Sequence, residues 1–113
     1  MHELSIAKSI LNTVLKVSKK KKIKEIKKIN LVIGDLSSVI DESFTYYFSL
    51  ISKDTVAKKA NIYIKRVPAI AKCTECKKSF ASTIPFEAIC KYCKSNKITI
   101  DGGRELFIES IET

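Results

Sequence analysis

Apolar residues near the start of the chain recur at intervals of three and four positions, the spacing that places side chains on one face of a helix. The apolar face consists of Leu4, Ile6, Ala7, Ile10, Leu11, Val14 and Leu15. The opposite face carries Lys8, Asn12 and Lys16. This pattern predicts an amphipathic helix over residues 3–18. A lysine run at 19–22 follows it, and we expect these cations to be solvated near the negative end of the helix dipole.

Three later segments alternate apolar and polar residues, which is the period of a β-strand. The first covers residues 28–33 and ends at Gly34 and Asp35, the second covers 60–67, and the third covers 105–112. Their alternating apolar positions include Ile29, Leu31, Ile33, Ile62 and Ile64. The chain is therefore predicted to contain a small sheet of about three strands.

A second helix is predicted over residues 42–52, between the first two strands. Its apolar face consists of Phe44, Tyr47, Phe48 and Ile51. Asp41 is a residue type that caps helix N-termini through its side chain. We expect the aromatic residues of this helix, Tyr46 included, to be buried in the core rather than exposed for binding.

All four cysteines lie between the second and third predicted strands, in two CxxC pairs. The pairs are Cys73 with Cys76 and Cys90 with Cys93, separated by thirteen residues. A CxxC turn directs two sulfurs to one point, so two such turns supply a tetrahedron of thiolates that suits zinc. Four protein ligands leave no open position, and the pattern therefore predicts a structural rather than a catalytic zinc ion.

Other uses of these cysteines rank lower. Disulfides are disfavoured in a cytosolic protein. A redox CxxC pair would not need a second copy. Iron bound by the same four sulfurs is a rarer alternative to zinc.

The order of these segments predicts an α+β fold with two helices and an inserted zinc-ribbon-like module. Residues 1–68 together with 104–113 would form the α+β domain, and residues 69–103 the zinc-binding module. Gly102 and Gly103 would give the backbone freedom to turn from the module into the last strand.

The chain carries 21 lysine and arginine residues against 12 acidic residues, a formal charge of +9. Four thiolates around one zinc ion lower this charge to about +7. Five lysines flank the cysteines and would partly balance the anionic centre. They are Lys72, Lys77, Lys78, Lys91 and Lys94. The charge also admits a zinc-ribbon nucleic-acid-binding protein, but only Arg66 and Arg104 carry the planar group favoured for phosphate and base contacts.

The sequence contains no apolar run of the ~20 residues that a membrane-spanning helix requires. The first ten residues do not have the basic-then-apolar layout of a signal peptide. We therefore expect a cytoplasmic protein. The single histidine, His2, has no nucleophile paired with it in the sequence, and there is no glycine-rich phosphate-binding loop, so we expect no enzymatic activity.

The wider pattern around His2 resembles a known family. The sequence MHELS at 1–5, Gly-Asp-Leu at 34–36, the two CxxC pairs and GGREL at 102–106 occur in that order. This combination resembles the HypA family, the nickel-insertion proteins of NiFe-hydrogenase maturation. The second cysteine pair departs from the family pattern, which usually has proline after the third cysteine and glycine after the fourth; here these positions are Lys91 and Lys94.

The resemblance implies an α+β nickel-binding body, a zinc module, and delivery of nickel with a partner GTPase to the hydrogenase large subunit. It also implies that His2 ligates Ni(II), assisted by the backbone of Met1 and Glu3. Nickel(II) favours nitrogen-rich, square-planar or tetragonal sites. In a square-planar nickel site, the His2 amide nitrogen has two adjacent coordination positions, and the His2 imidazole takes one of them. A planar site therefore needs a further ligand from water, a carboxylate such as Glu3, or a partner; alternatively, nickel has a higher coordination number. The sequence does not fix the nickel affinity, the complete ligand set, the choice between monomer and homodimer, or the motion of the zinc module relative to His2.

Overall fold

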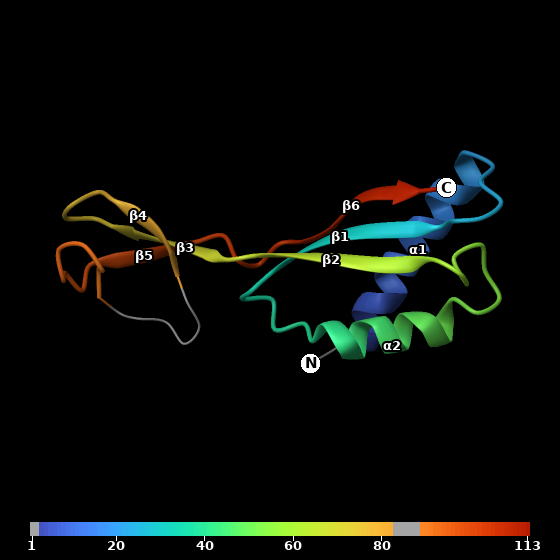
Figure 1. Ribbon diagram of the computed structural model, residues 1–113, viewed down its shortest axis with the longest axis horizontal. Coiled ribbons are helices and arrows are strands. Elements are labelled where there is room, and N and C mark those ends of the chain that lie inside the picture. Colours follow the sequence, from blue (N-terminus) through green and yellow to red (C-terminus); the bar gives the residue numbers. More distant parts are fainter. Residues whose placement is uncertain (1–2, 83–88) are drawn as a thin grey trace.

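A computed structural model describes residues 3–82 and 89–113 of the chain. The molecule is elongated, with extents of 54 × 25 × 17 Å, and its two three-stranded sheets lie at opposite ends (Figure 1). Two helices pack near one sheet, and the four cysteines lie beside the other. The predicted α+β fold with a four-cysteine module is confirmed. The exact domain limits of 68/69 and 103/104 stay a prediction.

The first helix, α1, spans Glu3–Lys20 and extends two residues beyond the predicted end. The helix stops where Lys22 adopts a left-handed conformation with φ 56°, and the N–H of Ile23 then donates to the carbonyl of Ser18. Such a residue commonly ends a helix because it turns the chain while satisfying a free carbonyl. No helix of the described chain combines the length and apolarity that a bilayer crossing requires.

Sheet A joins the three predicted strands in the order β2-β1-β6. Strand β1 spans Lys28–Gly34, β2 spans Asn61–Val67 and β6 spans Leu106–Glu112. The β1–β2 pair is parallel, so a crossover is needed, and α2 supplies it. The β1–β6 pair is antiparallel and has a register shift at Asn30 and Leu31.

One face of sheet A is covered by both helices and forms the hydrophobic core. Alternate residues of β1, Ile29, Leu31 and Ile33, are at most 1% exposed on this face. Phe44 and Phe48 of α2 pack on them with stacked rings whose centroids lie 6.0 Å apart. The predicted core assignment of these aromatics is confirmed, and the strand periodicity explains why the same β1 residues face the helices.

Helix α2 spans Asp41–Ile51, and its start and its exposed side differ from two expectations. Ile40, not Asp41, is the N-cap residue, and no side chain makes a capping hydrogen bond there. The Asp41 carboxylate instead forms an ion pair with the guanidinium group of Arg66 in β2, with a nitrogen–oxygen distance of 2.6 Å. Tyr46 is 60% exposed rather than buried, because it lies on the side of α2 that faces away from the core.

Sheet B has the order β4-β3-β5, and both of its strand pairs are antiparallel. Strand β3 spans Ala69–Cys73, β4 spans Ser79–Ser82 and β5 spans Ile98–Asp101. Strand β3 follows β2 with only Pro68 between them, and residues 102–105 lead from β5 back into β6. The connection between the two sheets therefore consists of two chain segments running side by side (Figure 1).

Glycines allow these two connecting segments to pass close to the end of β1. The N–H of Leu36 donates to the Gly103 carbonyl at 2.6 Å. A Cβ on Gly34 would lie only 2.2 Å from the carbonyl carbon of Gly103, so no side chain fits there. Gly102 and Gly103 have φ of +71° and +85°, which confirms the predicted use of this pair to turn the backbone.

Candidate metal centre

The first CxxC pair lies in the turn between β3 and β4. Cys73 is the last residue of β3, and its carbonyl accepts the N–H of Lys77 at 3.0 Å. The N–H of Cys73 in turn donates to the Lys78 carbonyl, also at 3.0 Å. Lys77 turns the chain with φ 63°. This folded turn brings Cys76 back toward Cys73.

The second CxxC pair repeats the same hydrogen-bond pattern. The carbonyl of Cys90 accepts the N–H of Lys94 at 3.0 Å, and the N–H of Cys90 donates to the Ser95 carbonyl at 2.7 Å. Lys94 has φ 66°, equivalent to the left-handed residue of the first turn. The two turns are therefore built alike, although they share no sequence beyond the cysteines and the following lysine.

The two turns bring all four sulfurs together. Each Sγ atom of the group formed by Cys73, Cys76, Cys90 and Cys93 lies within 4.8 Å of the others. Two of the sulfur–sulfur distances that join the two turns are 3.6 Å, one from Cys73 to Cys93 and one from Cys76 to Cys90. All four are free thiols, and these distances exceed the ~2.0 Å of a disulfide bond.

The sulfur spacing fits a tetrahedral metal ion. Zinc–sulfur bonds of about 2.3 Å place the sulfurs of a regular tetrahedron about 3.8 Å apart. Cys73 and Cys90 are buried and Cys93 is exposed. The predicted convergence of the four cysteines is thus observed, and soft thiolate donors in this arrangement suit zinc.

Backbone amides stabilise two of the thiolates. The N–H of Cys93 lies 3.5 Å from the Cys90 sulfur, and it contributes most to lowering the pKa of Cys90 to about 6. The backbone N–H of Cys76 likewise lowers the pKa of Cys73. The N–H of Ser95 lowers the pKa of Cys93, but partial desolvation of its sulfur and the three neighbouring thiols outweigh this effect and raise that pKa to about 12. Four adjacent thiolates repel one another, so complete ionisation requires a cation among them.

Aromatic rings engage part of the positive charge beside the cysteines. Lys78 and Lys91 place their ammonium groups 4.9 and 5.5 Å from the centre of the Tyr92 ring. The Phe80 ring meets Tyr92 edge-on at 6.0 Å. Cation–π contacts of this kind hold lysine ammonium groups over aromatic rings beside the cysteine cluster.

The second predicted site, at the N-terminus, is described only from Glu3 onward; His2 and Met1 lie outside the described residues. Glu3 is the first residue of α1 and is 5% exposed. Its Oε2 atom accepts the N–H of Ile40, the N-cap residue of α2, at 3.1 Å. The start of the chain is therefore attached to the start of α2.

The comparison that decides the family covers the whole chain. The family model described as hydrogenase/urease nickel incorporation, metallochaperone, HypA, matches residues 1–113. The chain belongs to the HypA family.

Curated HypA proteins resemble the chain over nearly its full length. The hydrogenase maturation factor HypA of Dehalococcoides mccartyi is 38% identical over 112 residues, which cover 99% of this chain and 93% of that protein. The HypA of Caldanaerobacter subterraneus is 36% identical, with 99% and 98% coverage. The chain therefore belongs to a group named for hydrogenase maturation and nickel incorporation, and its own four-cysteine cluster fits a metal site.

Solved HypA structures share the fold. The solution structure of the Ni metallochaperone HypA from Helicobacter pylori matches with a TM-score of 0.66 at 25% identity, covering 99% of this chain and 97% of that one. A second solution structure, of a HypA protein, matches with a TM-score of 0.70 at 25% identity, with 99% and 95% coverage.

The departure from the HypA pattern at Lys94 leaves the turn intact. The position where the family usually has glycine is a left-handed one, which explains that preference. Lys94 adopts the same conformation at a conformational cost of about 1–2 kcal/mol. The hydrogen bonds of the turn match those of the first pair, so the departure does not displace the sulfurs.

Sequence reasoning missed the role of Arg66 at the end of β2. Its guanidinium donates to the Gly34 carbonyl at 3.2 Å, to the Val39 carbonyl, and to the Asp41 carboxylate at 2.6 Å. These contacts fix the loop between β1 and α2, which also provides the Ile40 N–H bound by Glu3. The only signal in the sequence was the rarity of arginine, since the partners are 25 or more residues away.

Proposed function

We propose that this protein is a cytoplasmic nickel metallochaperone that binds Ni(II) at its N-terminus and helps to deliver it to the large subunit of NiFe hydrogenase. The observation that carries the proposal is the match of the whole chain, from residue 1, to a nickel-incorporation family. The His2 imidazole would be the principal ligand, with the backbone of Met1 and Glu3. A structural zinc ion would be held by Cys73, Cys76, Cys90 and Cys93.

The contact of Glu3 supports a nickel site with an incomplete ligand set. One carboxylate oxygen of Glu3 accepts the Ile40 N–H, which leaves this side chain less free to complete the site. Water or a partner donor would then fill the remaining position. An exchangeable position suits a carrier, because a recipient ligand can attack there before the first ligands leave.

The two metals would have different roles because their donors differ. The four sulfurs come from two turns that the fold builds before and after β4, and they enclose one point. Zinc bound there would contribute folding free energy. We assign no catalytic residue, and any nucleotide hydrolysis that delivery requires would come from a partner GTPase.

Nickel titrations of three forms of the protein test the proposal. His2→Ala should abolish tight Ni(II) binding while one zinc ion per chain remains. Two residues added before Met1 should weaken nickel binding, because the α-amine is removed from the site. Isothermal titration calorimetry gives the affinity, and elemental analysis gives the zinc content.

Lys8→Ala is the matched control, since its side chain is exposed on α1 close to the same end of the chain. Binding by the wild-type protein should weaken as the pH falls from roughly 8 to 6.5, where the amine and imidazole gain protons. Nickel affinity that is equal in the wild-type, His2→Ala and extended forms would place the site elsewhere.

A further inference from the structure

Strand β2 is an edge of sheet A that remains regular over its whole length. All seven of its residues pair in parallel register with β1, from Asn61 with Lys28 to Val67 with Gly34. The opposite edge, β6, is interrupted by a bulge, in which Glu109 has no partner on β1. Bulges protect sheet edges from further pairing. Of the two edges, β2 is therefore the one that can accept another strand.

The backbone of β2 exposes hydrogen-bonding groups at alternate residues. The N–H of Asn61 donates to Lys27, and the carbonyl of Val67 accepts from Asp35. In a parallel pair of strands, every second residue directs both its N–H and its C=O group to the neighbouring strand, and the residues between them direct these groups to the other side. Asn61, Tyr63, Lys65 and Val67 therefore bond inward to β1. The N–H and C=O groups of Ile62, Ile64 and Arg66 point outward along the free edge.

A groove between this edge and α2 provides space for side chains. It has a volume of about 300 Å³ and is lined by Thr45, Phe48, Ser49, Ser52 and Ile62 among others. Among its large apolar lining residues, Phe48 is buried and Ile62 is partly buried. Figure 1 shows α2 lying alongside β2, beyond which sheet A has no further strand. An apolar side chain entering here would cover Ile62 and meet hydroxyl groups of α2.

Lysines gather at the end of the groove near the start of β2. Residues 53–60, which precede β2, contain three lysines and one acid. Lys58 lines the groove and also a neighbouring hollow of about 200 Å³, which Lys24 and Lys59 line together with one acid, Glu25. The ion pairs seen in the described part of the chain do not involve these three lysines.

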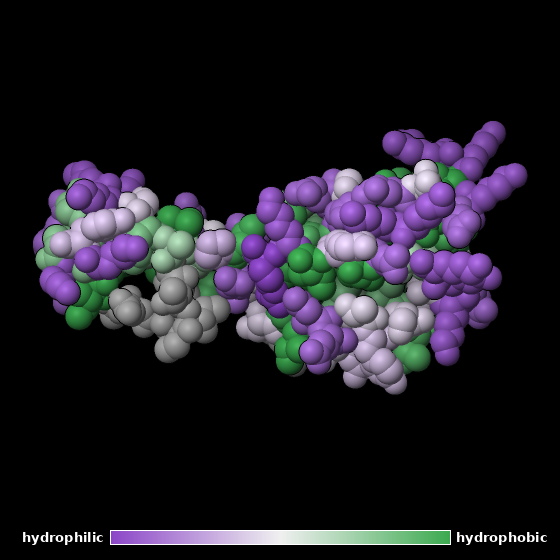
Figure 2. Space-filling model, in the orientation of Figure 1, coloured by the Kyte–Doolittle hydropathy of each residue, from purple (hydrophilic) through white to green (hydrophobic). Residues whose placement is uncertain are grey.

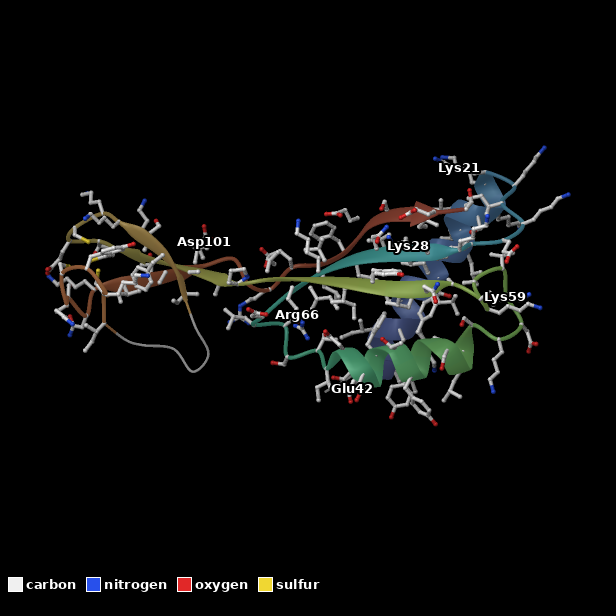
Figure 3. The ribbon with its side chains drawn as sticks, viewed as in Figure 1. Lys21, Lys28, Glu42, Lys59, Arg66 and Asp101 are labelled. Atoms are coloured by element: carbon white, nitrogen blue, oxygen red, sulfur yellow. The ribbon has the colours of Figure 1, made fainter. Side chains whose placement is uncertain are left out.

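The two ends of the groove differ in net charge. Lys59 lies near the start of β2, whereas Glu42 lies at the start of α2, near the end of β2, where Arg66 is also found (Figure 3). Arg66 is neutralised there by its ion pair with Asp41, so that end carries less net positive charge than the end beside Lys58 and Lys59. Figure 2 shows weakly polar side chains along the middle of α2 and strongly hydrophilic ones at both ends of the body. A bound segment would therefore be held in one direction, with its more acidic end beside the lysines.

We propose that an extended, acidic segment of a partner protein binds as a fourth strand on the β2 edge of sheet A. Its apolar residues would lie beside Ile62, which lines the groove, and beside Ile64 further along the strand. Its acidic residues, alternating with them, would point to the other face of the sheet beside Lys65. Backbone pairing gives such complexes their affinity, and the alternate pockets and charges give them specificity. This inference depends on the α+β body and not on either metal site.

Two other occupants fit the surface less well. A second copy of the chain would bring the same lysines and a second charge of +9 to the interface. A single-stranded nucleic acid would use the lysines but leave the outward N–H groups of β2 unpaired. An extended acidic peptide matches both features, because its backbone can pair with the free N–H groups of β2 and its acidic side chains can lie near the lysines.

Amide hydrogen exchange tests the proposal on the full zinc-loaded chain. The probe is a capped eight-residue peptide of alternating glutamate and valine. In the free protein, the N–H groups of Ile62, Ile64 and Arg66 should exchange quickly and those of Tyr63 and Lys65 slowly. The peptide should slow exchange at Ile62 and Ile64 at least about tenfold, because backbone hydrogen bonds form there. A peptide of alternating lysine and valine should leave exchange unchanged.

Matched variants test separately whether the groove and the positive charge contribute to peptide binding. Ser49→Trp should fill the groove and weaken binding about tenfold, whereas Tyr46→Trp, on the exposed side of α2, should not. Lys65→Glu should weaken binding by a similar factor, whereas Lys8→Glu, with the same net charge, should not. Unchanged spectra of each variant away from the substitution would show that it folds.

Three results would overturn the proposal. One is peptide binding that leaves exchange at Ile62 and Ile64 unaffected. Another is protection of these amides that rises with protein concentration alone, since this would indicate pairing between copies of the chain. The third is stronger protection by a single-stranded oligonucleotide than by the acidic peptide.

Discussion

The two ends of the molecule are held together by different means. Around sheet A, two helices bury large apolar side chains, among them Phe44, Phe48, Ile29 and Ile33. Around sheet B, the buried apolar residues of the described chain are small: Ala69, Ala71 and two cysteines. Short strands with so little core are marginal in water. We therefore expect sheet B to depend for its stability on a metal ion bound by the four cysteines, whereas sheet A depends on its hydrophobic core.

Removal of the metal should have the largest effect, and only on one side of this comparison. A chelator, or Cys90→Ser, should disorder residues 70–102 while the helices and sheet A persist. Zinc-binding free energies on the order of 10–16 kcal/mol in small peptides indicate how much stabilisation is lost. NMR amide dispersion should collapse for sheet B, and the helical circular dichroism signal should remain. Uniform unfolding of both sheets would contradict the separate stabilisation of the module and its predicted limits.

A core substitution should produce the converse result. Phe44→Ala removes a fully buried ring and should lower the free energy of unfolding of the body by about 3–5 kcal/mol. Zinc content should be unchanged, because no cysteine contacts this core. Chemical denaturation followed by circular dichroism, with parallel zinc analysis, measures both quantities. Loss of zinc along with the helices would mean that the two ends fold as one unit.

The periodic segments explain why the body was predictable and the junction was not. The apolar spacing of α1 and β1 lies within short segments, so the sequence alone predicts both elements. Each CxxC pair is also a short local turn, and the presence of a second pair is what indicates a metal site. The partners of Arg66, in contrast, are brought together by the parallel pairing of β2 with β1, which no short pattern encodes. Asp41 was assigned to a cap because its local sequence permits one, but the tertiary ion pair prevailed.

The junction between the two ends provides an intermediate effect. Gly34→Ala would place a Cβ 2.2 Å from Gly103 and should destabilise the fold by about 1–3 kcal/mol. Gly102→Ala is the control: its nearest neighbour would be a Glu105 side-chain oxygen at 3.4 Å, so only its φ of +71° carries a cost, about 1 kcal/mol. Thermal unfolding of both zinc-loaded variants compares them. Equal melting temperatures for Gly34→Ala and the wild-type protein would exclude the close contact.

The smallest effect concerns the turn around the fourth cysteine. Lys94→Gly should stabilise the zinc-loaded module by about 1 kcal/mol, since glycine adopts a positive φ without strain. Lys77→Gly should act similarly in the first turn, whereas Lys97→Gly, outside both turns, should not stabilise. Competition with a zinc-binding dye measures the change as a shift in zinc affinity. A weaker affinity for Lys94→Gly would show that the lysine side chain contributes more than the strain it imposes.

The central claim is that four sulfur ligands hold a zinc ion permanently, whereas nitrogen ligands at the N-terminus hold a nickel ion for transfer. X-ray absorption on protein loaded with both metals tests this claim most directly. We expect four sulfur ligands around zinc in both the wild-type protein and His2→Ala. Nickel should have nitrogen and oxygen ligands with an imidazole contribution in the wild-type protein, and this contribution should vanish in His2→Ala. Sulfur ligands on nickel, or an identical nickel spectrum in the two proteins, would contradict the account.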